Sequence, residues 1–131
     1  MQFSVEHLGL PARDPAALAD WYVRTLDATL AYTDGETPPA FFVQLPGGVL
    51  LEIYPARATN PETANNKLAG WRHVALRVDS IATAKSLLES RGVKFTKEID
   101  SAFAGGRVLY FADPEGNLLH LVERAPDWPL K

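Results

Sequence analysis

Three histidines and one glutamate are the residues of this chain best suited to bind a metal ion. His7, His73 and His120 are the only histidines among its 131 residues, and there is no cysteine. Thiolate metal sites and cysteine nucleophiles are therefore excluded. Neutral imidazoles together with one carboxylate, here Glu52, form a donor set suited to Zn, Ni, Mn or Fe. The alternative from the residues alone is that these are core or surface histidines with ordinary hydrogen bonds.

These four residues recur at matching places in two halves of the chain. His7 and His73 are 66 residues apart, and Glu52 and His120 are 68 residues apart. Each half then has one candidate ligand in its first predicted strand and another in its last. Because side chains alternate along a strand, each candidate shares its face mainly with aliphatic neighbours. We interpret such a face as the lining of a cavity, since it would be a poor solvent face.

The elements that position these residues follow the order β-α-β-β-β twice. Asp14-Pro15 is typical of a helix start, as is Asp79-Ser80 in the second half, and Gly92 is suited to a helix end. The predicted strands are Phe3–Leu10, Thr29–Tyr32, Ala40–Leu45, Val49–Tyr54, Arg72–Val78, Val93–Glu98, Arg107–Ala112 and Leu118–Glu123. We expect one domain made of module one at 1–56, a linker at 57–70, module two at 71–124 and a tail at 125–131. A module of this size cannot bury both faces of its sheet alone, so the two modules should pack together.

Composition narrows the class of partner. Thirteen basic against sixteen acidic residues give a formal net charge of −3, so there is no basic surface of the kind that nucleic acid requires. No apolar run is long enough for a membrane span, and the first residues lack the features of a signal peptide. We expect a cytoplasmic protein with a small-molecule ligand, no nucleic acid and no membrane partner.

Four segments resemble the vicinal oxygen chelate superfamily, which includes glyoxalase I, bleomycin-resistance proteins and extradiol dioxygenases. The most specific is Tyr110–Glu123, with the sequence Tyr-Phe-Ala-Asp-Pro-Glu-Gly-Asn-Leu-Leu-His-Leu-Val-Glu, which resembles the family's closing hairpin. Arg72–Asp79 and Val5–Leu10 resemble the starts of the two family modules, and Leu50–Tyr54 resembles the end of the first. The resemblance covers residues 3–124 and implies an α+β, glyoxalase-like fold, in which two tandem βαβββ modules form a curled mixed sheet.

The resemblance also implies a site. Its metal ligands would be His7, Glu52, His73 and His120, binding a divalent ion. Glyoxalase-like members usually carry Glu where this chain has His120, and Glu123 cannot replace it because three residues along a strand reverse the face. Glu52 would then be the carboxylate available as a catalytic base.

Three functions remain open at this point. The leading one is a metal-dependent lyase or isomerase that acts on a small oxygen-rich metabolite through an enediolate-like oxyanion. The others are an Fe(II) dioxygenase and a non-catalytic binder of the bleomycin-resistance type. The resemblance further implies a homodimer. Arg77 would bind a substrate carboxylate or phosphate, unless it is an exposed strand-end arginine, and Tyr54 would orient the substrate, unless it serves in aromatic packing.

Overall fold

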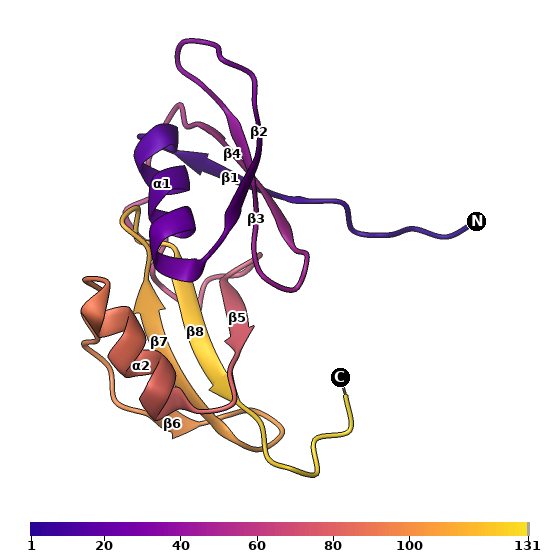
Figure 1. Ribbon diagram of the computed structural model, residues 1–131, viewed down its shortest axis with the longest axis vertical. Helices are drawn as coiled ribbons and strands as arrows, with labels where there is room; N and C mark the ends of the chain where they lie inside the picture. The colour runs from indigo at the N-terminus through magenta and orange to yellow at the C-terminus, as the bar shows by residue number, and fades with distance from the viewer. Residues whose placement is uncertain (131) are drawn as a thin grey trace. The chain divides into compact units, whose positions relative to one another are not determined.

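The computed structural model describes residues 1–130, and the chain divides into two units (Figure 1). The first unit ends at Asn60 and the second begins at Pro61, so their boundary falls inside the predicted linker at 57–70. Each unit has the predicted order of one strand, one helix and three further strands. The prediction of two tandem βαβββ modules is confirmed.

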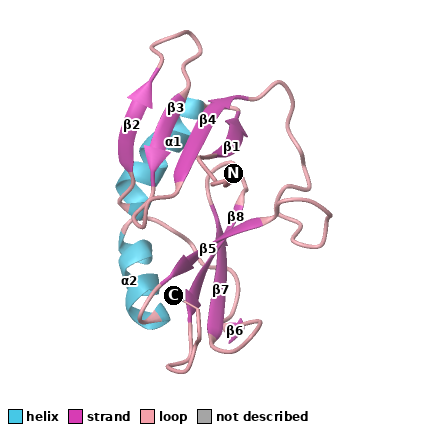
Figure 2. Ribbon diagram, turned by 90° about the vertical axis from the view of Figure 1, so that its right-hand side faces the viewer, coloured by secondary structure: helices cyan, strands magenta, loops and turns pink. Residues whose placement is uncertain are grey.

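The first unit is a four-stranded mixed sheet with one helix on a single face (Figure 2). Its strands lie in the order β1-β4-β3-β2, with β1 parallel to β4 and the other pairs antiparallel. The elements are β1 (Leu8–Ala12), α1 (Pro15–Leu26), β2 (Thr29–Thr33), β3 (Phe41–Gln44) and β4 (Leu50–Pro55).

The second unit repeats this topology. Its strands lie in the order β5-β8-β7-β6, with β5 parallel to β8 and the others antiparallel. The elements are β5 (His73–Arg77), α2 (Ile81–Ser90), β6 (Asp100–Ser101), β7 (Arg107–Ala112) and β8 (Leu118–Glu123).

Local sequence explains where both helices begin. Asp14 caps α1, because its Oδ1 accepts a hydrogen bond from the Ala17 amide at 3.0 Å, and Pro15 takes the first helical position, where no donor is lost. Ser80 caps α2 by accepting from the Thr83 amide at 3.2 Å. Gly92 follows α2 at φ +93°, a left-handed conformation that glycine adopts without strain.

One face of each sheet forms a core with its helix, and the opposite face carries the candidate ligands. The helix-side core of the first unit includes Leu18, Val43, Leu51 and Ile53, and that of the second unit includes Ile81, Leu109, Leu119 and Leu121. Alternation along β4 and β8 then puts Glu52 and His120 on the faces that the helices leave uncovered.

Two predicted strands are wrong in their bounds. The first strand begins at Leu8, not Phe3, because Leu8 pairs with Leu51 and the partner strand β4 begins only one residue earlier. Residues 93–98 form no strand, and the short β6 lies at Asp100–Ser101 instead. The apolar alternation there has another cause: Val93 is buried, and the ring of Phe95 packs 5.5 Å from that of Phe111.

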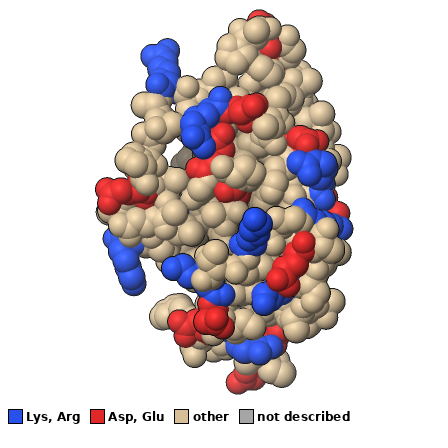
Figure 3. Space-filling view, turned by 90° about the vertical axis from the view of Figure 1, so that its left-hand side faces the viewer, with Lys and Arg blue, Asp and Glu red and all other residues tan. Residues whose placement is uncertain are grey.

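Neither of the described helices combines the length and the apolarity needed to cross a membrane. Lys and Arg are interspersed with Asp and Glu over the face drawn in Figure 3, without a continuous basic patch on that face.

Candidate metal centre

His7 and Glu52 lie together in the first unit. Glu52 sits on β4 opposite Gly9 of β1, and His7 comes two residues before Gly9, just ahead of the strand. His7 Nε2 and Glu52 Oε2 are 3.6 Å apart, which is too long for a hydrogen bond. The His7 ring also meets Phe42 edge-on, with ring centroids 5.5 Å apart. The two donors are thus held near each other without being bonded to each other.

His73 and His120 form the corresponding pair in the second unit. His120 sits on β8 opposite Ala75 of β5, and His73 comes two residues before Ala75. Their rings meet edge-on, with centroids 4.7 Å apart. The offset between histidine and partner is therefore the same in both units, which is the equivalence that the sequence spacing of 66 and 68 residues indicated.

His120 is a buried imidazole that the described residues leave unsatisfied. His120 is only 7% exposed, and neither ring nitrogen has a hydrogen-bond partner among residues 1–130. Burial is the main cause that lowers the pKa of His120 to about 4, and electrostatic repulsion from His73 and Arg124 contributes to the same shift. The ring is therefore uncharged at neutral pH, and one of its nitrogens has a lone pair that could bind a metal ion. Buried polar atoms without partners are rare in native structures and call for such an explanation.

The donor spacings fit a divalent ion. Two atoms that bind one tetrahedral ion at about 2.0–2.1 Å lie roughly 3.3 Å apart, close to the separation of His7 Nε2 and Glu52 Oε2. Two imidazoles on such an ion have ring centres roughly 5.2 Å apart, and the 4.7 Å between the ring centres of His73 and His120 is close to this separation. Each pair alone offers two donors, and within residues 1–130 no His, Asp or Glu cluster of three or more is present.

The other predicted site residues have identifiable surroundings. The Tyr54 ring covers Gly9, whose missing Cβ would lie 3.4 Å from it, on the same β4 face as Glu52. Arg77 is exposed at the end of β5 and donates to the Leu130 carbonyl at 3.3 Å. Their roles toward a substrate remain predictions.

Glu123 is held away from His120, as strand alternation predicted. Its Oε2 accepts a hydrogen bond from the Ile81 amide at 2.8 Å, at the first residue of α2, and its carboxylate pairs with Arg107 at 3.1 Å. It therefore stabilises the start of the helix and cannot take the place of His120 as a ligand.

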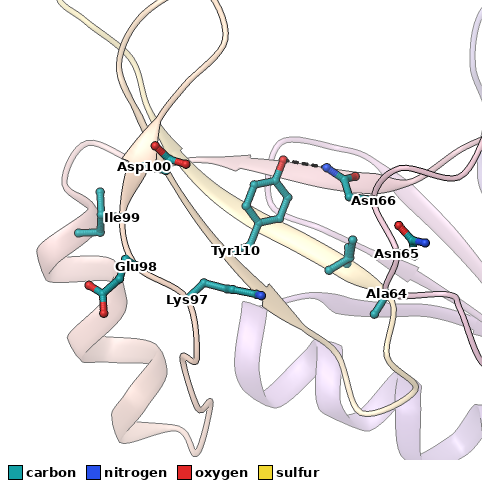
Figure 4. Close-up of a pocket in the computed structure, with 9 residues that line it drawn as sticks. Ala64, Asn65, Asn66, Lys97, Glu98, Ile99, Asp100 and Tyr110 are labelled. Atoms are coloured by element: carbon teal, nitrogen blue, oxygen red, sulfur yellow. Dashed lines mark hydrogen bonds between the residues drawn. The ribbon is translucent and has the colours of Figure 1, made fainter.

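A pocket in the second unit contains residues that the sequence interpretation missed. Its volume is about 630 Å³, and its lining comes from the 64–66 segment, the 97–100 segment and the strands β7 and β8 (Figure 4). Tyr110 is the direct link to the histidine pair: it is paired with His120 across the sheet, and their rings stack at 4.7 Å and 19°. The sequence could have indicated Tyr110, because the 113–117 turn joins the strand of Tyr110 to that of His120 and pairs the two residues. Asn66 lay in the predicted linker, where nothing periodic marked it.

Comparisons with known proteins agree with this fold. The pattern of the glyoxalase/bleomycin resistance protein/dioxygenase superfamily matches residues 4–121. No curated protein matches the chain.

Several solved structures share the fold. A glyoxalase family protein from Enterococcus faecalis is 25% identical, with a TM-score of 0.72 over 92% of this chain and 97% of that one. A bleomycin resistance determinant encoded on the transposon Tn5 is 25% identical, with a TM-score of 0.66 over 93% and 98%. The fosfomycin resistance protein FosX of Listeria monocytogenes, crystallised with Mn(II) and sulfate, is 17% identical, with a TM-score of 0.70 over 97% and 94%. Together with the match over residues 4–121, this means that the chain belongs to the glyoxalase/bleomycin resistance protein/dioxygenase superfamily.

Proposed function

We propose that this protein is a metal-dependent enzyme of the glyoxalase type, a lyase or isomerase, that acts on a small oxygen-rich metabolite. One observation carries the proposal: equivalent donor pairs stand at the same register in both units, and the buried His120 has no other partner among the described residues. Membership of a superfamily that includes glyoxalases supports it, as does the Mn(II) found in FosX, which shares the fold.

In this proposal His7, Glu52, His73 and His120 bind one divalent ion, which is Zn, Ni, Mn or Fe. Three neutral imidazoles and one carboxylate suit these metals and leave the ion with a net positive charge. When bound, the ion would act as a Lewis acid toward neighbouring oxygens of the substrate.

Glu52 is the base in this proposal, because it is the one carboxylate among the four. Its side chain is 36% exposed, so an Oε atom is accessible to a substrate C–H next to a carbonyl. In an α-hydroxycarbonyl compound, a carboxylate oxygen that takes this proton and returns it to the former carbonyl carbon would carry out an isomerisation, with the hydroxyl proton passing to the former carbonyl oxygen. Tyr54, on the same strand face, would orient the substrate beside Glu52, and Arg77 would bind an anionic group of the substrate.

The pocket of the second unit suits an oxygen-rich molecule. Asn66, Tyr110 and Lys97 bring amide, phenol and ammonium donors to its lining, and Figure 4 shows the Lys97 side chain extending beneath Tyr110. Its volume of about 630 Å³ falls in the range of small-molecule sites. We further propose a homodimer located in the cytoplasm.

Hydrogen exchange at carbon tests the role of Glu52. The metal-loaded protein should replace C–H by C–D in α-hydroxycarbonyl compounds dissolved in D2O, as followed by the loss of proton NMR signals. Glu52→Gln should slow this exchange by about 100-fold or more, since general-base catalysis contributes about 10²–10⁴-fold. Glu6→Gln is the matched control, because Glu6 also lies near His7, at 3.7 Å, but is 78% exposed and outside the proposed site. Full exchange by Glu52→Gln would refute the role of Glu52.

A non-catalytic binder is the second candidate. The observation in its favour is that the pocket is lined by none of the four proposed ligands, and the Tn5 bleomycin resistance determinant is 25% identical. Tight binding of a small molecule that persists in excess chelator, without exchange at carbon, would favour the binder. Activity that is lost in air and restored by Fe(II) would instead favour a dioxygenase.

A further inference from the structure

Asn66 connects the second histidine pair to the pocket. Its Oδ1 lies 2.8 Å from Nδ1 of His73, and its Nδ2 donates to the Tyr110 hydroxyl at 3.4 Å. Asn66 precedes β5 by seven residues, so this contact is made by a folded-back connection rather than by the sheet itself. In Figure 4 the dashed line joins its amide to Tyr110 across the pocket.

In the structure the side-chain amide of Asn66 faces His73 with Oδ1 and Tyr110 with Nδ2. An amide has one oxygen that accepts and one nitrogen that donates. With Nδ2 directed at the Tyr110 hydroxyl and Oδ1 at His73, the His73 ring must donate from Nδ1. A neutral imidazole carries a single ring proton, so Nε2 of His73 then carries the free lone pair.

We propose that Asn66 is a positioning residue that holds His73 in the Nδ1–H tautomer and presents Nε2 to the metal ion. The proposal rests on the metal-dependent function proposed above. A histidine that binds a metal through one nitrogen commonly donates the other N–H to an oxygen acceptor, which fixes the ring and makes it a better ligand. The Asn66 amide oxygen is such an acceptor, and at 2.8 Å the hydrogen bond is short.

Tyr110 extends the same support to the second imidazole. Its ring stacks on His120, and it meets His73 edge-on with centroids 5.7 Å apart. Its hydroxyl anchors the Asn66 amide. One asparagine and one tyrosine therefore hold both rings of the pair, and both residues also line the pocket.

Nitrogen NMR of the metal-free protein tests the tautomer directly. At pH 8, long-range ¹H–¹⁵N spectra should show His73 with its proton on Nδ1, both in the wild type and in Asn66→Asp, which keeps an oxygen acceptor. In Asn66→Leu the proton should move largely to Nε2, the form that an unsupported imidazole prefers in water. Asn65→Leu is the matched control, because Asn65 lines the same pocket but accepts its hydrogen bond from the Lys67 amide, and it should leave His73 unchanged. A wild-type His73 with its proton on Nε2 would overturn the proposal.

Metal affinity gives the second readout. Titration with Zn(II) or Mn(II) should show a 10–100-fold weaker affinity for Asn66→Leu, with recovery in Asn66→Asp and no change in Asn65→Leu. If Asn66→Leu does not fold, Tyr110→Phe serves instead, because it removes the hydroxyl that anchors the amide and should weaken binding in the same direction. Unchanged affinity in these variants would overturn the role of Asn66. A wild type that has the Nδ1–H tautomer but binds no metal would instead refute the proposed function.

Discussion

Replacing His120 by Phe should make the metal-free protein more stable. His120 is 7% exposed, and neither of its nitrogens has a hydrogen-bond partner among the described residues. Leaving a buried polar group unsatisfied costs about 1–3 kcal/mol. Phe removes the two polar atoms and keeps a flat ring against Tyr110, with which His120 now stacks at 4.7 Å. The expected gain is therefore about 1–3 kcal/mol, or roughly 4–12 °C in Tm for a chain of this length.

The order of stability should reverse when metal is added. A metal present at 100 times its Kd stabilises the wild type by about 2.7 kcal/mol, which is roughly 10 °C in Tm. His120→Phe lacks one of the four proposed donors and should gain far less. His73→Phe is the control: His73 is exposed and already bonded to Asn66, so its replacement should give no gain in chelator, but it should also abolish most of the response to metal.

Thermal unfolding in chelator and in excess Mn(II) measures both effects. His120→Leu is tested alongside, because Phe is larger than His and overpacking costs about 1–3 kcal/mol. If both variants are less stable than the wild type in chelator by more than about 1 kcal/mol, then the His120 nitrogens have partners and the reasoning is refuted.

Two further predictions concern the support of the second unit. Gly106→Ala should lower the free energy of unfolding in urea by about 3 kcal/mol or more, because a Cβ at Gly106, which has φ +99°, would clash with the Glu123 carbonyl oxygen. Gly105→Ala is the control: Gly105 has φ +95° but open space around the new Cβ, so the loss should be about 1 kcal/mol. Equal losses of stability in the two variants would contradict this steric explanation. The hydrogen bond from the Ile81 amide, together with a smaller contribution from the Arg107 side chain, lowers the pKa of Glu123. Folding therefore favours the charged form of Glu123, and this stability is present above pH 4.5 and lost as the pH falls through the lowered pKa. Glu123→Gln should therefore be less stable than the wild type at pH 7 but equal to it near pH 2, and a difference that does not change with pH would refute this.

Strong local signals made much of the fold predictable. Asp14-Pro15 gave the start of α1, and the turn at 113–117 gave the bounds of β7 and β8 as the structure has them. The strand at 93–98 was wrong because an alternating apolar pattern reports burial, and Val93 is buried without pairing. Pairing depends on a neighbour that the local sequence does not reveal.

The candidate site was also predictable only in part from the sequence. Alternation along β4 and β8 placed Glu52 and His120 on faces away from the helices, and the structure brings each next to the predicted histidine of its own unit. Asn66 could not be found from the sequence, because its contact with His73 depends on how a loop folds back. That both pairs bind one ion also remains a prediction.

Metal content tests the central claim most directly. The protein should be purified without chelator, dialysed against Mn(II) and then against metal-free buffer, and analysed by elemental mass spectrometry beside the Ala variants of His7, Glu52, His73 and His120. The account predicts one transition-metal ion per chain in the wild type, and a loss of most of that metal in each of the four variants, including both that come from the first unit. A wild type with far less than one ion per chain would contradict the account, as would full metal content in His7→Ala and Glu52→Ala.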